Sequence, residues 1–528
     1  MRRGNGQHLP PGWVASPLND IAQINPSLDR CVLNNDVDVT FVPMHAVEAE
    51  GGGLVRSEVR PYGEVKKGYT SFLSGDVIMA KITPCMENGK TAVVPVVSGQ
   101  RCFGSTEFHV IRPEQGVQSR WIAQFLLQHE VRRAAQRQMT GGVGQMRVPA
   151  AFLESVQVPV APSAEQSRIA DALDELFSDL DAGVATLERV RETLKLYRAS
   201  VLKAAVEGAL TAEWRGQHPY IEPASELLKR ILAERRRRWE EDQLAKFKAK
   251  GQEPPKNWKA KYKEPVAPDT TDLPPLPEGW CWATVDQCSV LIQYGTSAKT
   301  REDADGIAVL RMGNLTSDGR LTLDDLKYLP NNHLEFPDLL LAEGDLLFNR
   351  TNSAELVGKT AIYSGIPAPC SFASYLIRVR FIAGLSSSIV MFTLNGGFGR
   401  AWIKDVANQT VGQANVNGSK LAAFAFPLSP IAEQEIIVEA IEDQLSVIDH
   451  FEADLAAKLK SAQALRQAIL RHAFTGRLVP QDPNDEPASE LLKRIAAERE
   501  SRARETGRKP GGARNRRRRA SSGGRVPA

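Results

Sequence analysis

The chain has 528 residues, of which 66 are Lys or Arg, 63 are Asp or Glu and 42% are hydrophobic. These values are typical of a soluble globular protein of two to four domains, and they exclude a collagen, a wholly disordered chain and a disulfide scaffold. No run of 18 apolar residues occurs and no apolar segment follows the amino terminus, so neither a membrane span nor a secretory signal is predicted and a cytoplasmic location is expected.

The two halves of the chain repeat each other at a spacing of 264 to 269 residues. A period this long is typical of a duplicated two-part unit and not of a solenoid, whose repeats are much shorter. The matching segments are Leu9–Trp13 with Leu276–Trp280 (L-P-x-G-W), Gly75–Asp76 with Gly344–Asp345, Gly89–Ala92 with Gly358–Ala361 (G-K-T-A), Gly144–Gln145 with Gly412–Gln413, Glu165–Gln166 with Glu433–Gln434, and Glu222–Ile231 with Glu486–Ile495 (E-P-A-S-E-L-L-K-R-I).

Each half begins with a strand-rich part. Short runs bounded by Gly, Pro or Asn predict strands, and residues 119–138 have the apolar spacing of a helix. Each part is therefore predicted to be an α+β domain of about 150 residues. The predicted strands are 76–80, 91–95 and 107–111 in the first half, and 345–348, 360–363 and 375–379 in the second.

A long helix is predicted after each domain. Ser163 with Gln166 predicts a capping box at the start of the first helix, and Ser429 before Pro430 has a similar place in the second. A helix of about 40 residues would be about 60 Å long, too long to be buried by its own domain. Apolar residues recur every three or four positions, as in a seam between long helices, at Ile169, Leu173, Leu176, Leu180, Val184, Leu187, Val190, Leu194, Tyr197 and Val201, and at Ile437, Ile441, Leu445, Ile448, Phe451, Leu455, Leu459, Ala462, Leu465 and Ile469.

The natural partner of each long helix is its duplicate, and antiparallel pairing would place the two domains at opposite ends of the pair. The alternative is that each helix packs on a different protein. The predicted fold class is α+β, with two similar mixed domains separated by two long antiparallel coiled-coil helices. The predicted boundaries are 1–161 for the first domain, 162–222 for the first long helix, 223–275 for a charged helical extension and linker, 276–428 for the second domain, 429–485 for the second long helix, 486–498 for the repeated helical segment and 499–528 for a basic tail.

The segments outside the domains are amphipathic or charged. The repeated E-P-A-S-E-L-L-K-R-I segment is interpreted either as a docking surface or as a solvated helical extension. Residues 499–528 contain eleven basic against two acidic side chains, which predicts a disordered tail. Such a tail either holds a polyanion loosely through its phosphates or has no fixed role.

No catalytic, cofactor or metal motif is complete. The G-K-T tripeptides at 89–91 and 358–360 resemble the end of a phosphate loop, but Pro84 and Ser353 replace its first glycine. Neither H-E-x-x-H nor a G-x-S-x-G elbow occurs, nor the Asn-Pro-Pro-aromatic tetrapeptide of amino-methyltransferases. The six cysteines include no C-x-x-C pair, which predicts reduced thiols and no zinc site.

Polar loops lie at matching places in the two domains, 81–90 with 349–359 and 140–147 with 410–417. Lys, Arg, Asn and Thr side chains can contact phosphates or base edges, and Glu can accept a hydrogen bond from cytosine N4. Loops of this composition also occur merely as turns. The candidate DNA-binding residues are Lys81, Thr83, Glu87, Asn88, Lys90, Gln145 and Arg147 in the first half, and Arg350, Thr351, Asn352, Ser353, Lys359, Gln413 and Asn415 in the second.

Several motifs in duplicated order carry a resemblance to a known family over nearly all of residues 9–499. They are the L-P-x-G-W openings, the G-D strands followed by a polar loop and G-K-T-A, the P-x-x-E-Q helix starts at Pro162 and Pro430, and the helix ends at Gly208 and Gly476. In this order they resemble the DNA-specificity subunits of type I restriction-modification systems.

The resemblance implies two target-recognition domains that each read one half of a split DNA sequence. It also implies a non-catalytic adaptor for two methyltransferase subunits and for restriction-translocase subunits, with S-adenosylmethionine, ATP and magnesium held by those partners. Because the two domains differ outside the shared motifs, we expect an asymmetric bipartite target, with a gap near one duplex turn set by helix length. The rival interpretation is a scaffold protein whose paired helices organise other proteins.

Overall fold

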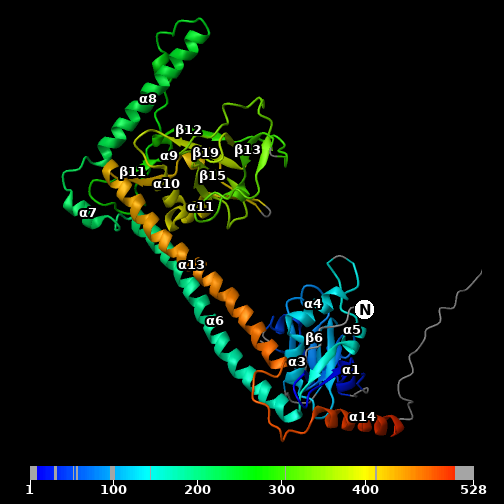
Figure 1. Ribbon diagram of the computed structural model, residues 1–528. Coiled ribbons are helices and arrows are strands. Elements are labelled where there is room, and N and C mark those ends of the chain that lie inside the picture. Colours follow the sequence, from blue (N-terminus) through cyan, green and yellow to red (C-terminus); the bar gives the residue numbers. More distant parts are fainter. Residues whose placement is uncertain are drawn as a thin grey trace, which may run out of the picture. The chain divides into compact units, whose positions relative to one another are not determined.

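The computed structural model describes residues 9–28, 33–50, 53–54, 57–95, 101–142, 144–303, 305–410 and 413–505. The chain divides into two compact units, unit 1 up to Leu187 and again from Ala457, and unit 2 from Glu188 to Ala456. Each unit contains one α+β domain and part of each long helix, so the predicted fold class is confirmed (Figure 1). None of the helices in the described ranges combines the length and hydropathy that a membrane crossing needs.

The domain of unit 1 is built on two four-stranded sheets. Its strands are β1 Val14–Pro17, β2 Ala22–Ile24, β3 Asp38–Val42, β4 Glu58–Pro61, β5 Thr70–Leu73, β6 Val77–Ala80, β7 Thr91–Val93, β8 Arg101–Gly104, β9 Phe108–Pro113 and β10 Gln157–Val160. The sheet orders are β2-β9-β6-β7 and β4-β3-β8-β5, and only β3 and β8 run parallel among these neighbours. A separate antiparallel pair, β1 with β10, joins the beginning of the domain to its end.

The helices of unit 1 cover these sheets and begin the helical pair. They are α1 Leu18–Ile21, η1 Met44–Ala46, α2 Tyr62–Val65, α3 Ser119–Leu126, α4 His129–Arg137, α5 Ala150–Ser155, α14 Ala488–Glu505, the first part of α6 Ser163–Val206 and the last part of α13 Ile431–Phe474. The single helix predicted over 119–138 is wrong, because α3 and α4 are separated at Leu127 and Gln128. The Gln467 side chain of α13 bonds both sides of this break, accepting from the His129 backbone N–H at 2.8 Å and donating to the Leu127 carbonyl at 3.4 Å.

Unit 2 repeats this topology. Its strands are β11 Cys281–Thr284, β12 Ser289–Tyr294, β13 Ile307–Leu310, β14 Lys327–Leu329, β15 Leu346–Asn349, β16 Thr351–Asn352, β17 Thr360–Ile362, β18 Cys370–Phe372, β19 Leu376–Phe381, β20 Asn408–Thr410, β21 Gln413–Asn415 and β22 Ala425–Leu428. The order β12-β19-β15-β17 matches β2-β9-β6-β7, and β14-β13-β18 matches the first three strands of β4-β3-β8-β5. β13 and β18 are again parallel, and β11 pairs with β22. A further small sheet, β16-β21-β20, has no full counterpart in the described part of unit 1.

The helices of unit 2 include two that follow the long helix α6. They are α7 Ala212–Gln217, α8 Ala224–Ala249, η2 Trp258–Lys261, α9 Val285–Cys288, η3 Met312–Asn314, α10 Ser387–Asn395, α11 Gly397–Val406 and α12 Gly418–Ala422. Helices α10 and α11 are broken at Gly396, as α3 and α4 are broken in unit 1.

The repeated Trp and Glu residues form the same hydrogen bond in each unit. Trp13 Nε1 donates to Glu165 at 2.9 Å, and Trp280 Nε1 donates to Glu433 at 2.8 Å. Each bond joins the start of a domain to the first turn of a long helix. The L-P-x-G-W and E-Q repeats therefore fix the helix to its domain.

The glutamine that follows each of these glutamates also bonds the domain. Gln166 accepts from the Gln118 backbone N–H at 3.0 Å and donates to the Ala161 carbonyl at 2.8 Å. The capping box predicted for Ser163 and Gln166 is therefore wrong, since Ser163 Oγ donates to the Gly116 carbonyl instead. In unit 2, Gln434 makes the equivalent bonds to Ser386 and Ser429.

The aspartate of each repeated G-D pair is structural. Asp76 is buried and receives a bidentate pair of hydrogen bonds from Arg112, both at 2.7 Å, while Asp345 receives the same from Arg380 at 2.6 Å. A buried carboxylate is tolerated only when it is paired in this way.

The two long helices run antiparallel in each unit. In unit 1, Asp181 of α6 pairs with Arg466 of α13, and in unit 2 Arg198 of α6 pairs with Asp449 of α13. The apolar seam is buried near the domains, where each core includes residues of both helices. Five predicted seam residues are instead exposed, namely Leu176, Val190, Tyr197, Phe451 and Leu465.

Two of these differences have a visible cause in unit 1. Phe177 is buried in place of Leu176, and the Arg466 guanidinium lies 4.3 Å from the centre of its ring. A buried arginine that stacks on an aromatic ring occupies the seam where Leu465 was expected.

The repeated segments after the long helices pack on the domain of their own unit. The Ala224 backbone N–H donates to the Gly279 carbonyl at 2.7 Å, and that of Ala488 donates to the Gly12 carbonyl at 2.8 Å. The repeated segments are therefore not merely solvated extensions, because each packs on a domain of this chain, and docking of another protein on them stays a prediction. The buried residues are Leu227 and Ile231 of α8, and Leu491 and Ile495 of α14.

The basic tail was predicted to be disordered from residue 499, and this is wrong for its first seven residues. They continue α14 to Glu505, because Arg499 and Arg502 both donate to the buried Glu114, at 2.9 and 3.0 Å. Residues 506–528 lie outside the described residues.

Candidate nucleic-acid interface

In unit 1 the two polar loops singled out in the sequence lie side by side. The Lys81 carbonyl accepts from the Val148 backbone N–H at 2.8 Å, and Ile82 forms an antiparallel bridge with Arg147. The turn after β6 is therefore bonded to the segment that leads into α5, and the two loops form one surface.

The corresponding loops of unit 2 are also paired. β16 and β21 run antiparallel, with Thr351 opposite Asn415, and Asn415 Nδ2 donates to Thr351 Oγ1 at 2.6 Å. The Val416 backbone N–H donates to the Arg350 carbonyl at 2.9 Å. Figure 1 labels β15, the strand that leads into this loop pair.

Both loop pairs are built on the same backbone frame. The Lys81 N–H donates to the Glu107 carbonyl at 2.9 Å, and the Arg350 N–H donates to the Tyr375 carbonyl at 2.9 Å. Lys81 therefore corresponds to Arg350, and Glu107 corresponds to Tyr375. The bridges between the loops make Arg147 the counterpart of Asn415.

A buried or half-buried arginine supports each first loop from a helix. Arg132 of α4 donates to the Glu87 carbonyl at 2.7 Å and to the Glu50 carboxylate at 2.9 Å. Arg400 of α11 donates to the Val357 carbonyl at 2.8 Å. Because these bonds hold the loop backbone, the exposed side chains are displayed from a fixed surface.

Two of the candidate residues are used within the protein. Lys90 Nζ donates to the Met44 carbonyl at 3.0 Å, and Lys359 Nζ donates to the Leu315 carbonyl at 2.7 Å. Burial lowers the pKa of Lys359. Both ammonium groups tie a loop to the neighbouring 3-10 helix, which leaves them less free to reach a ligand.

The remaining candidates differ in exposure and partners. Thr83 Oγ1 accepts from the Met146 backbone N–H at 3.2 Å, and Glu87 accepts from Gln136 at 2.9 Å. Asn88, Gln145 and Gln413 are exposed, Thr351 is buried, and Lys81, Thr83, Glu87, Arg147, Arg350, Asn352, Ser353 and Asn415 are half-buried. Their contact with DNA stays a prediction.

At the edge of unit 1, Arg147 is held by three hydrogen bonds within the protein. Its Nε and Nη2 donate to the two carboxylate oxygens of Glu107 at 2.9 and 2.8 Å, and its Nη1 donates to the Gln145 carbonyl at 3.1 Å. The hydrogen bond from Arg147 lowers the pKa of Glu107, with further lowering from Lys81 and His109, so this carboxyl remains ionised at neutral pH.

At the equivalent edge of unit 2, Arg350 lies against an aromatic ring. Its guanidinium carbon is 4.8 Å from the ring centre of Tyr294, whose hydroxyl accepts from the Gly418 backbone N–H at 2.7 Å. Tyr294 and Tyr375 are both partly exposed there, at 43% and 49%. Exposed aromatic rings beside an arginine are suited to stacking and to phosphate contact.

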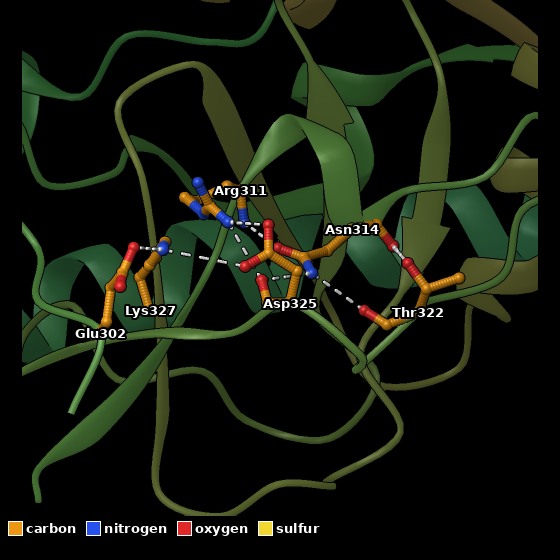
Figure 2. Close-up of polar contacts among 6 residues, drawn as sticks. All are labelled: Glu302, Arg311, Asn314, Thr322, Asp325 and Lys327. Carbon is orange, nitrogen blue, oxygen red and sulfur yellow. Dashed lines mark hydrogen bonds and ion pairs between the residues drawn. The ribbon is translucent and has the colours of Figure 1, made fainter. Parts of the chain in front are cut away.

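A second polar network belongs to unit 2 (Figure 2). Arg311 donates to Asp325 at 2.7 Å, and Lys327 donates to Glu302 at 2.7 Å while lying 3.8 Å from Asp325. Asn314 joins the network through the Thr322 and Asp325 carbonyls. The network lies near Arg350. The carbonyl of Leu310, the residue before Arg311, accepts from the Ala373 backbone N–H, and the Arg350 side chain donates to the carbonyl of Ser374, the residue after Ala373.

The strand register shows which residues of unit 1 occupy the positions equivalent to this network, and they are of different types. Ala308 pairs with Cys370 as Thr40 pairs with Cys102, which makes Pro43 the counterpart of Arg311. The pairings of β13 with β14 and of β3 with β4 make Glu58 the counterpart of Lys327. At this position the two domains carry opposite charges.

Sequence reasoning missed Glu107, Tyr294, Tyr375, Arg311 and Lys327. Glu107 and Tyr375 were assigned to predicted strands, whereas each lies in the turn just before β9 or β19. The repeat could have located Glu107 and Tyr375, because they stand 18 and 17 residues after the glycine of the G-K-T-A motif of their half.

Among the cysteines of the described residues, Cys102, Cys288 and Cys370 are buried, and Cys85 and Cys281 are half-buried. Burial raises the pKa of Cys102 and Cys281 to about 11 and that of Cys288 and Cys370 to about 12, so these thiols are protonated at neutral pH. Burial lowers the pKa of His109, whose Nε2 lies 2.8 Å from the Val148 carbonyl. Within the described ranges, no group of three or more His, Cys, Asp or Glu side chains is arranged to hold a metal ion.

Comparison with known proteins finds relatives of this chain in sequence and in fold. Residues 10–189 match a family model described as the type I restriction modification DNA specificity domain. The Escherichia coli type I restriction enzyme EcoEI specificity subunit is 28% identical over 507 residues, covering 86% of this chain and 80% of that protein. The EcoAI specificity subunit, also from Escherichia coli, is 28% identical over 483 residues, covering 82% and 78%.

The fold also matches a solved structure. A chain from a study of complex assembly and conformational transition in a type I restriction-modification system superposes with a TM-score of 0.64. It is 18% identical, and the match covers 89% of this chain and 99% of that one. The likeness at this identity is one of fold.

Proposed function

We infer that this chain is the DNA-specificity subunit of a type I restriction-modification system, because a specificity-domain model matches its first domain and specificity subunits match most of its length. The matching solved structure has the same fold over most of the chain. In such a subunit, the exposed edge of each domain would contact DNA.

We propose that the chain reads an asymmetric bipartite target, one half with each domain. The observation that carries this proposal is that one backbone frame displays different side chains in the two domains. A shared frame would approach DNA in the same way, while different donors and acceptors would select different bases. The corresponding pairs are Lys81 with Arg350, Glu107 with Tyr375, Arg147 with Asn415, Pro43 with Arg311, and Glu58 with Lys327.

We further propose that the chain is a non-catalytic adaptor. Two methyltransferase subunits and restriction-translocase subunits would bind it, and S-adenosylmethionine, ATP and magnesium would be held by those partners. The names of the relatives support this division, since each is the specificity subunit of a restriction enzyme. Binding of partners would use the helices that join the two domains in sequence.

The test is to sequence methylated positions in DNA modified by the chain together with its methyltransferase subunits. We expect two unlike half-sequences separated by a fixed gap. Lys81→Ala and Asn88→Ala should alter only one half, and Arg350→Ala and Asn352→Ala only the other, because each pair lies in one domain. A change of about tenfold or more in base preference is expected for a residue that contacts a base edge.

Other results would contradict the proposal. A continuous or perfectly symmetric target would refute two independent readers. Simultaneous loss of both half-sequences in every variant would indicate damage to the fold. Absence of any DNA binding, with and without methyltransferase subunits, would favour the scaffold interpretation.

A further inference from the structure

Arg147 has two N–H groups left for a ligand after its bonds within the protein. Three of the five donors of its guanidinium are used, Nε and Nη2 on Glu107 and Nη1 on the Gln145 carbonyl. One N–H on Nη1 and one on Nη2 remain, and the side chain is 41% exposed. The free donors lie on adjacent nitrogens of a planar group whose other side is occupied.

The orientation of this guanidinium is fixed because the backbones of both Arg147 and its partner Glu107 are hydrogen-bonded within the domain. The Arg147 backbone exchanges two hydrogen bonds with Thr140, at 2.9 and 3.0 Å, and is bridged to Ile82. The Glu107 carbonyl accepts from Lys81, and its backbone N–H donates to Ser105 Oγ at 3.2 Å. Because both partners are anchored, binding through the free N–H pair would cost little side-chain entropy.

A pair of parallel N–H donors matches one base in the major groove. Guanine presents two acceptors there, O6 and N7, whereas the other bases present at most one acceptor beside a donor or a methyl group. The Glu107 carboxylate has both oxygens engaged by Arg147, so it holds the guanidinium and cannot compete with the base for these donors.

We propose that Arg147 recognises a guanine in the half-target read by the first domain, donating to O6 and N7, and that Glu107 is the positioning residue for this contact. The proposal rests on the proposed function and gives it a base identity. In the second domain the counterparts are Asn415, whose amide donates to Thr351, and Tyr375. The half-target of the second domain therefore lacks this arginine–guanine contact at the equivalent position.

The experiment uses the full chain with its methyltransferase subunits and a DNA library randomised in each half-target in turn. For the unchanged chain, one position of the first half should be guanine. Arg147→Ala should reduce the preference for guanine there by about tenfold to hundredfold and leave the second half unchanged. Arg147→Lys should keep the overall affinity for DNA better than Arg147→Ala but not restore the guanine preference, because lysine is a point donor.

Two further variants separate the roles of the pair. Glu107→Gln should weaken the guanine preference less than Arg147→Ala does, since one amide oxygen still accepts from Arg147 while the bidentate bond is lost. Asn415→Ala is the matched control at the equivalent position and should change only the second half. Thermal unfolding of each variant shows whether its domain is intact.

The outcomes distinguish this inference from the function on which it rests. If the unchanged chain selects no first half-target at all, the proposed function is wrong. If it selects one and Arg147→Ala leaves every base preference intact, or removes both halves together, Arg147 is not a base reader. If only Glu107→Gln is without effect, the positioning role of Glu107 is refuted.

Discussion

Equivalent residues of the duplicated motifs differ between the two units in their hydrogen bonds. Glu433 accepts from Trp280 and also from Thr211 Oγ1 and Arg215 Nη1, both at 2.6 Å. Among the described side chains Glu165 accepts from Trp13, and its Oε1 is buried without a hydrogen-bond partner. Burial raises the pKa of Glu165, although the Trp13 bond opposes this. The same motif is therefore satisfied in unit 2 and under-satisfied in unit 1.

This difference predicts a pH dependence for unit 1. Because the pKa of Glu165 is higher in the folded state, its contribution to the free energy of unfolding is full below the unfolded value of about 4.3 and is lost as pH rises through the folded value. Glu165→Gln should stabilise unit 1 at pH 7 by about 1 kcal/mol and flatten this dependence. Urea unfolding at pH 5 and pH 8, followed by tryptophan fluorescence, measures both effects.

The matched variant Glu433→Gln should have the opposite sign. This substitution leaves Arg215 and Thr211 with a neutral acceptor, so we expect the free energy of unfolding of unit 2 to fall by about 2 kcal/mol. If both substitutions changed stability in the same direction, the missing hydrogen-bond donor at Glu165 would not explain a difference between the two units.

Among the elements, α8 and α14, which follow the long helices α6 and α13, pack on their domains in the same way. Leu227 and Leu491 are 3% and 2% exposed, at the same position of the repeated segment. Further along, Arg235 donates to the Ser289 carbonyl and Arg499 donates to the Ala22 carbonyl, again at matching places. Apolar burial and one arginine thus hold each helix.

This packing predicts that α8 and α14 can each be destabilised without the other. Leu491→Ala should cost about 2 to 5 kcal/mol of local stability and speed hydrogen exchange in α14, while Leu227→Ala should do the same in α8. Lys493→Ala is the control, because its side chain is 72% exposed and a surface change should remain within about 0.5 kcal/mol. Exchange in α14 that does not respond to Leu491→Ala would contradict docking through this leucine.

At the scale of the whole molecule, the two long helices are shared between the two units. α6 and α13 each have 44 residues and each contributes to both units. Their ion pairs, Asp181 with Arg466 and Arg198 with Asp449, follow one antiparallel register within the units. We propose that this pair sets the gap between the two half-targets.

Removing one heptad from each helix tests this proposal. Deletion of 188–194 together with 453–459, the segment that the register assigns to it, shortens each helix by about 10 Å, or about three base pairs. The tolerated gap should shorten accordingly while both half-sequences stay the same, as read from methylated positions. An unchanged gap would refute the spacer role, and deletion of 188–194 alone should abolish binding because the register is lost.

The sequence alone determined the duplication, the two α+β domains and the two long helices. Repeats and apolar periodicity are properties of the order of residues along the chain, so they can be read from the sequence by itself. It also located the polar loops, of which 81–90 and 349–359 adjoin the repeated G-K-T-A motif.

Only the tertiary structure decided how individual side chains are used. Gln166 bonds the domain instead of capping its helix, and Lys90 and Lys359 turn inward to backbone carbonyls. Glu107 meets Arg147 across 40 residues because the register of β6 and β9 and the bridge at Ile82 bring the two segments together. Such pairings depend on strand register and burial, which a linear pattern does not specify.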